Sequence, residues 1–150
     1  MQNEKSRQRL YALLLAFGAS VLLYRTLSMM LKEGALEILL PWAIILLFIE
    51  FLFDLACLVF SIRWFILNQR DKATIALRLG AAATVLHALR VGVYILGRTG
   101  PWYDFDIRPE IRQEYTFNWF WVNFAGVMAV LGLAGVLVVW WLTRNYKRGY

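Results

Sequence analysis

The chain has 150 residues, 61% of them hydrophobic, and its mean hydropathy is +0.56. Soluble domains contain roughly 45–50% apolar residues, so this composition indicates a membrane protein and leaves no length for a separate soluble catalytic domain. The net charge of +6 does not indicate nucleic-acid binding, because the basic residues stand mostly at the edges of apolar stretches and no recognition motif is present.

The first apolar stretch covers residues 10–31 and follows a polar, basic start. About 20 apolar residues at 1.5 Å each cross a hydrocarbon layer of roughly 30 Å, so the stretch predicts a membrane-spanning helix. Arg25 interrupts it near its outer end. A cleaved signal peptide is the alternative, since basic residues precede the apolar core and Gly18, Ala19 and Ser20 are small. The apolar run continues past them, which favours an uncleaved helix.

Three further spans follow, at residues 38–62, 76–97 and 117–143. The second has Pro41 in its first turn, where no helical hydrogen bond is lost, and the third ends in a segment that contains Gly100 and Pro101. The fourth carries no charge. We therefore predict an all-α membrane protein, a four-helix transmembrane bundle that forms a single domain over residues 1–150.

The distribution of basic residues predicts the orientation of these spans. Four crossings place both termini on one side, and that side receives ten basic residues against five on the other. The positive-inside rule then places both termini in the cytoplasm, with the cell (inner) membrane as the location. Trp64, Trp140 and Trp141 are expected at headgroup level on the cytoplasmic side.

Four ionisable residues inside the spans are the candidate functional site. Glu50 and Asp54 are four residues apart and share a face of the second span, while His87 and Arg90 are three apart and share a face of the third. Counting residues along each span places Glu50 and His87 at a similar depth and Arg90 slightly outside it, so Glu50 is expected to meet Arg90 or His87. An isolated charge there costs about 3 kcal/mol, so these groups should face the bundle interior.

This polar cluster admits a structural interpretation and two functional ones. A buried ion pair between helices would fix helix order or help subunits dock, and this interpretation is favoured. Alternatively, the cluster relays protons or ions, or grips a lipid-like head group. His87 is the only histidine and Cys57 the only cysteine, so we expect no metal and no cofactor within one chain.

Small residues recur at every fourth position of the third span, a spacing that lets two helices approach closely in lipid: Gly80, Thr84, Ala88 and Gly92. With the absence of catalytic motifs, this stripe favours a non-enzymatic subunit or partner-binding component of a membrane assembly. The partners would be the lipid bilayer and other membrane subunits or further copies of the chain. A proton- or ion-coupled transport component and a membrane enzyme acting on a lipid-like substrate are the alternatives.

Overall fold

The structure is a computed structural model that describes residues 2–32, 35–98, 108, 119–142 and 144. The described residues form five helices and no strand: α1 (Gln2–Leu31), α2 (Ala35–Ile38), α3 (Pro41–Leu67), α4 (Arg70–Arg98) and α5 (Trp119–Leu142). Four of them are long and apolar enough to cross a membrane, over Asn3–Leu31, Pro41–Leu67, Arg70–Val93 and Asn123–Leu142. The expected set of four long apolar helices is therefore confirmed.

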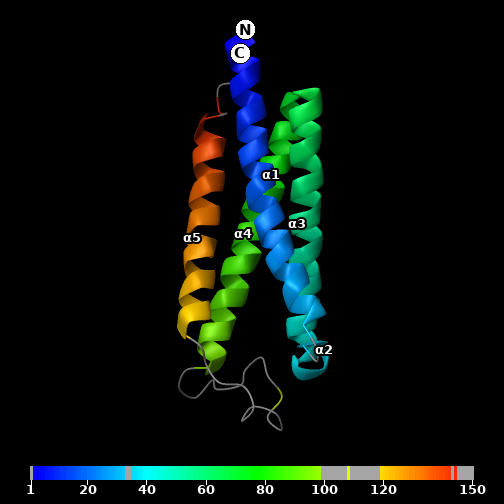
Figure 1. The fold of residues 1–150 in the computed structure, drawn as a ribbon, viewed down its shortest axis with the longest axis vertical. Helices are drawn as coiled ribbons and strands as arrows, with labels where there is room; N and C mark the ends of the chain where they lie inside the picture. Colours follow the sequence, from blue (N-terminus) through cyan, green and yellow to red (C-terminus); the bar gives the residue numbers. More distant parts are fainter. Residues whose placement is uncertain (1, 33–34, 99–107, 109–118, 143, 145–150) are drawn as a thin grey trace.

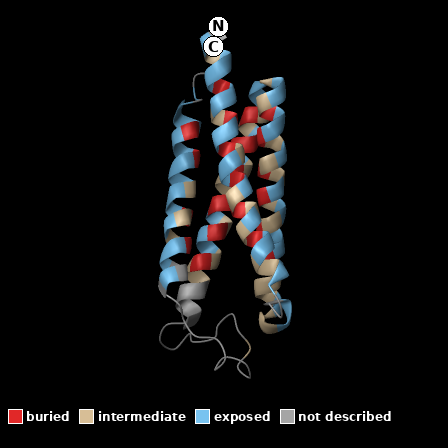
Figure 2. Cartoon of the chain, in the orientation of Figure 1, coloured by how far each residue is buried: buried red, intermediate tan, exposed pale blue. Residues whose placement is uncertain are grey.

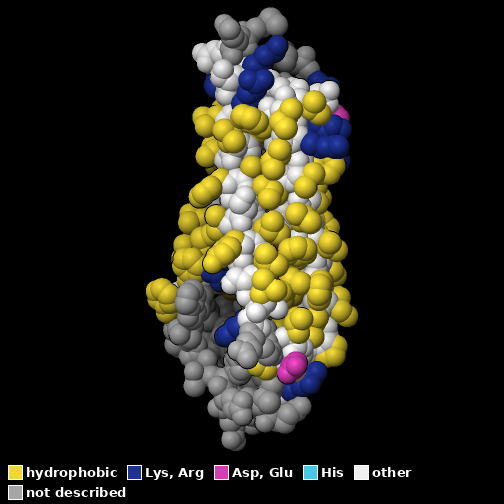
Figure 3. Space-filling model, turned by 45° about the vertical axis from the view of Figure 1, so that its right-hand side comes forward, with side chains coloured by type: hydrophobic (Ala, Val, Ile, Leu, Met, Phe, Trp, Pro, Cys, Tyr) yellow, Lys and Arg dark blue, Asp and Glu magenta, His cyan; other side chains and the backbone are white. Residues whose placement is uncertain are grey.

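The four long helices form an antiparallel bundle (Figure 1). The helix α1 packs mainly on α3, α3 on α4 and α4 on α5, so each long helix packs on the next one along the chain. The start of α1 and the end of α5 lie at the same end of the bundle. On the face shown in Figure 3, hydrophobic side chains form a band along the middle, and basic side chains gather at that end. We call it the basic end.

Three of the helices begin at residues that differ from the starts of the expected spans. The second span was expected from residue 38, but a four-residue helix, α2, ends at Ile38 and α3 begins at Pro41. The helix α4 begins at Arg70, six residues before the expected span, because helical hydrogen bonding continues through the charged turn that hydropathy excludes. Similarly, α1 extends back to Gln2 through its basic segment.

The interior of the bundle is lined by an unusual face of α3 (Figure 2). The buried residues of α3 recur every three or four positions and are Leu47, Glu50, Asp54, Cys57, Ser61 and Trp64. Of these, only Leu47 has a pure hydrocarbon side chain. The outward face of α3 carries large exposed hydrophobic residues such as Ile45, Leu52 and Ile62. This inversion is expected in lipid, where the polar groups of a helix must face its neighbours.

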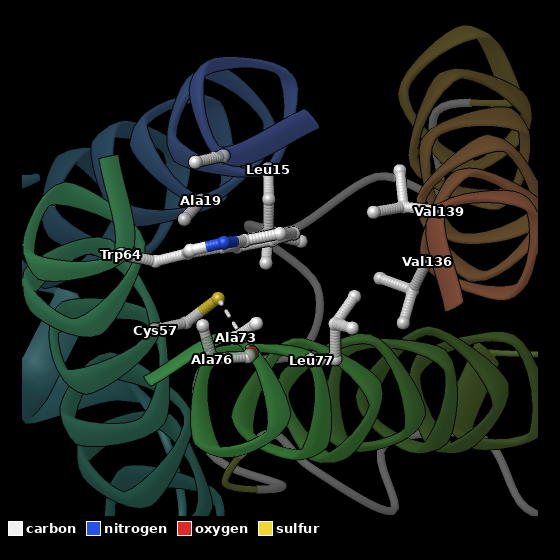
Figure 4. Close-up of a cluster of buried hydrophobic side chains, with 10 residues drawn as sticks. Leu15, Ala19, Cys57, Trp64, Ala73, Ala76, Leu77, Val136 and Val139 are labelled. Carbon is white, nitrogen blue, oxygen red and sulfur yellow. Dashed lines mark hydrogen bonds between the residues drawn. The ribbon is translucent and has the colours of Figure 1, made fainter. Parts of the chain in front are cut away.

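Trp64 closes the interior near the basic end. Its side chain is fully buried, and Figure 4 shows the indole lying across the bundle between Leu15 and Ala19 of α1 and Ala76 of α4. Small neighbours make room for the ring. Trp64, which was expected as an interfacial ring, thus faces the interior of the bundle, whereas Trp140 and Trp141 are exposed, at 54% and 55%. Sequence position near a span end does not reveal which side of the helix faces lipid.

Candidate functional site

Glu50 is the centre of the candidate site. It lies nine residues after the start of α3, which is about 14 Å along the helix axis, and its side chain is 0% exposed. Two side chains of α4 contact its carboxylate. His87 Nδ1 lies 2.9 Å from Glu50 Oε1, and the Arg90 guanidinium donates through Nε to Oε2 and through Nη2, at 3.3 Å, to Oε1. The structure thus brings together Glu50, His87 and Arg90.

The positions of His87 and Arg90 on α4 explain why both reach one carboxylate. Residues three apart lie on the same helix face, one turn apart, and α4 packs directly against α3. Arg90 is also held from α1, where Met29 Sδ lies 3.3 Å from Arg90 Nη1. The guanidinium therefore connects three helices, α1, α3 and α4, and its side chain is 15% exposed.

The contacts of His87 define where its ring proton sits. An ionised carboxylate only accepts hydrogen bonds, so the bond to Glu50 requires a proton on Nδ1. Arg90 Nη2, itself a donor, lies 3.2 Å from the same Nδ1 and therefore cannot bond to it in that state. His87 Nε2 is buried and has no hydrogen-bond partner among the described residues. A neutral ring exposes only a lone pair there, which costs less than an unpaired N–H⁺.

Asp54 belongs to the same buried face of α3 but has different partners. Its Oδ2 lies 2.9 Å from the hydroxyl of Thr26 on α1, and the side chain is 0% exposed. Its other oxygen, Oδ1, has no partner among the described residues. None of the ion pairs within the described parts of the chain involves Asp54. The structure therefore separates the two carboxyl groups: Glu50 is paired with a cation, and Asp54 is not.

Arg25 is a further member of the site that the sequence analysis placed near the outer end of its span. It is close enough to interact electrostatically with Glu50 and Arg90, and its guanidinium carbon lies 4.7 Å from the centre of the Phe124 ring on α5. All four long helices therefore contribute to the site. The sequence could have indicated this role through the charge of Arg25, because an arginine within an apolar span is expected to face the other intramembrane charges. Thr26 gave no comparable signal.

The small-residue stripe on α4 divides into two halves. Gly80 and Thr84 are buried within the bundle; a Cβ added at Gly80 would lie 3.2 to 3.4 Å from Leu15, Cys57 and Val136. By contrast, Ala88 is exposed, and a Cβ added at Gly92 would meet none of the described residues within 4 Å. The first half of the stripe therefore packs against other helices of this chain. The second half has no such packing against the described residues.

The site has no evident metal-binding arrangement within the described ranges, where no group of three His, Cys, Asp or Glu side chains converges. Comparisons with known proteins add no family: no family model, no curated protein and no solved structure matches the chain. Four long apolar helices are compatible with a small integral membrane protein.

Proposed function

We propose that this chain is a small membrane protein that acts as the proton- or ion-coupled component of a transport system. One observation carries the proposal: two fully buried carboxyl groups lie one helical turn apart inside the bundle, and only one of them is paired with a cation. An ionisable residue inside a membrane bundle is by default a candidate for a proton or ion pathway.

A purely structural cluster would need fewer groups than this one contains. A single Glu50–Arg90 pair is enough to align α3 with α4. Asp54, His87 and Arg25 add three further polar groups, each of which keeps a buried atom without a partner in the described parts of the chain. Such atoms cost free energy, and their persistence at one place favours a function for the site.

The orientation supports transport between defined sides. We propose the cell (inner) membrane, with the basic end in the cytoplasm, because the described basic residues at the N-terminal half of α1 and at the α3–α4 turn gather there. Trp64 follows Glu50 and Asp54 along α3, on the side of the basic end, and then lies between these carboxyl groups and the cytoplasm.

Subunit docking is the second candidate function, and a specific observation favours it. The outer half of the α4 stripe, at Ala88 and Gly92, is small and uncovered by the described residues. Small residues allow a helix of another subunit to approach closely in lipid. The two candidates are compatible, since a transport component can also be a subunit of a larger assembly.

Enzymatic activity on a lipid-like substrate has no comparable support. Ser20 and Ser61 donate to carbonyl groups of their own helices, at 2.8 and 2.7 Å, and neither forms a hydrogen bond with His87. Neither serine is therefore paired with the histidine as a serine nucleophile would be.

Proton flux in liposomes tests the proposal. The purified chain is reconstituted with a pH-sensitive dye inside, and a membrane potential is imposed. Glu50→Gln should abolish flux, because it removes the charge that His87 and Arg90 hold. The matched control is Glu37→Gln, the same change at an exposed position of α2, which should retain flux. Equal flux from both variants, or none from the wild type, would overturn the proposal.

A further inference from the structure

We propose that Asp54 carries a proton at neutral pH while Glu50 remains ionised, so that the transported proton is bound at Asp54. The assignment starts from the hydroxyl group of Thr26. Thr26 Oγ1 lies 2.9 Å from two oxygens, Asp54 Oδ2 and the carbonyl oxygen of Leu22 one turn earlier on α1.

A hydroxyl group has one proton to donate, and a carbonyl group can only accept. If Asp54 were ionised, Oδ2 and the Leu22 carbonyl would compete for that single proton, and one of the two short contacts would lack a hydrogen. A proton on Asp54 Oδ2 removes the conflict. Asp54 then donates to Thr26 Oγ1, and Thr26 donates to the Leu22 carbonyl, so both contacts become hydrogen bonds.

The second oxygen of Asp54 leads to the same assignment. Oδ1 is buried and has no donor among the described residues. On a carboxylate this oxygen would hold a share of a full charge without compensation, whereas on a neutral acid it is an ordinary carbonyl oxygen, which costs far less to bury. Glu50 provides a comparison on the same helix. Its two carboxylate oxygens contact three nitrogen atoms, one of His87 and two of Arg90.

The charges around Asp54 come from three of the four helices. Glu50 on its own helix disfavours a second negative charge one turn away, and Cys57 lies one turn in the other direction. From α4, Arg90 interacts with Asp54 but is already engaged with Glu50, and His87 bonds to the same carboxylate. From α1, Arg25 lies near Glu50 and Arg90. The helix α5 carries no titratable side chain over residues 119–142.

The two carboxyl groups lie in different surroundings and therefore have different roles in a proton site. Glu50 is the fixed anion that balances Arg90. Asp54 binds the proton on Oδ2 and releases it as H⁺, leaving a carboxylate that accepts the hydroxyl hydrogen of Thr26 in its place. The use of this proton in transport rests on the proposed function, but its presence does not.

Infrared spectroscopy of the full chain in liposomes detects the proton directly. A protonated carboxyl group has a C=O stretching band that a carboxylate lacks, and the band shifts in D₂O. At neutral pH we expect this band in the wild type, its loss in Asp54→Asn, and its retention in the exposed control Asp71→Asn. Absence of the band in the wild type, or its full retention in Asp54→Asn, would overturn the assignment.

Isotope labelling keeps the test valid if a variant fails to fold. Aspartate labelled with ¹³C at the side-chain carboxyl is incorporated into the wild-type protein, which contains four aspartates, at positions 54, 71, 104 and 106. The band should shift to lower frequency; an unshifted band would place the proton on a glutamate and contradict the assignment. A band at Asp54 in a protein without proton flux would refute the proposed function and leave this inference intact.

Discussion

The guanidinium group of Arg90 on α4 contacts both carboxylate oxygens of Glu50 on α3, and it does so at a place where the Glu50 side chain is entirely removed from solvent. This two-point contact fixes the relative rotation of the helices as well as their distance, because a planar guanidinium group meets a carboxylate in few orientations. Removing one partner alone should therefore affect the stability of the bundle differently from removing both partners.

Arg90→Met should destabilise the bundle by roughly 3–5 kcal/mol, because it leaves the Glu50 charge buried without its arginine. Adding Glu50→Gln to this variant should restore much of the loss, since no unpaired charge remains. The midpoint of unfolding in mild detergent measures both effects. Arg78→Met, at an exposed position of the same helix, is the control; equal midpoints for Arg78→Met and Arg90→Met would contradict the role given to the pair.

Thr26→Val should weaken the contact between α1 and α3 by about 0.6 to 1.7 kcal/mol, the range for interhelical hydrogen bonds in membranes. The change keeps the shape of the side chain and removes the hydroxyl that bonds to Asp54. Thr26→Ser should restore the wild-type stability. The matched control is Thr74→Val, because Thr74 donates within its own helix, to the Arg70 carbonyl at 3.0 Å. A cost at Thr74 as large as at Thr26 would speak against the interhelical bond.

Trp64→Ala should be the most damaging hydrophobic truncation near the basic end, at roughly 3–5 kcal/mol. The indole is 0% exposed and fills the space among small residues of α1 and α4, so its loss leaves a cavity that rigid helices cannot close. Phe17→Ala removes a ring that is 71% exposed and should have little effect on the same unfolding midpoint. Similar losses for the two rings would show that Trp64 does not seal the interior.

Gly80→Leu and Gly92→Leu should separate packing within the chain from docking of a partner. The first places a side chain against Leu15, Cys57 and Val136 and should lower the stability of the isolated chain. The second enters open space and should leave that stability unchanged. Native mass spectrometry of gently extracted protein then tests docking: loss of a bound subunit only in Gly92→Leu supports the second candidate function, and identical spectra for Gly92→Leu and the wild type exclude this face.

The sequence was sufficient to predict the four long helices and a contact of Glu50 with Arg90 or His87, whereas the structure shows both contacts. Both predictions follow from one physical constraint, since lipid accepts only apolar surface and thereby directs intramembrane charges inward at a depth set by 1.5 Å per residue. Counting residues therefore located the level of the contact, and the spacing of His87 and Arg90 located the face of α4.

The rest depended on how the helices rotate about their axes, which hydropathy does not encode. The sequence predicted that Asp54 and Glu50 share a helix face but not that Thr26 contacts Asp54. The sequence pattern around a single threonine in an apolar helix is the same whether its side chain faces lipid or a carboxyl group. Trp64 was expected at the membrane surface for the same reason. The sequence also allows a short helix over residues 106–115, because Ile107, Ile111 and Tyr115 share one helical face; apart from Arg108, these residues lie outside the described part of the chain.

The connection between α3 and α4 has a consequence for how the chain enters a membrane. Asn68 adopts a left-handed conformation, with φ of 50° and ψ of 41°, and its N–H bonds to the Trp64 carbonyl at 2.7 Å. Only Asn68 and Gln69 separate the two helices, so they fold back on each other as a hairpin. A hairpin of this kind can enter a bilayer as a unit, and because the contacts of Glu50 with His87 and Arg90 are made between α3 and α4 alone, the pairing of these charges requires neither α1 nor α5.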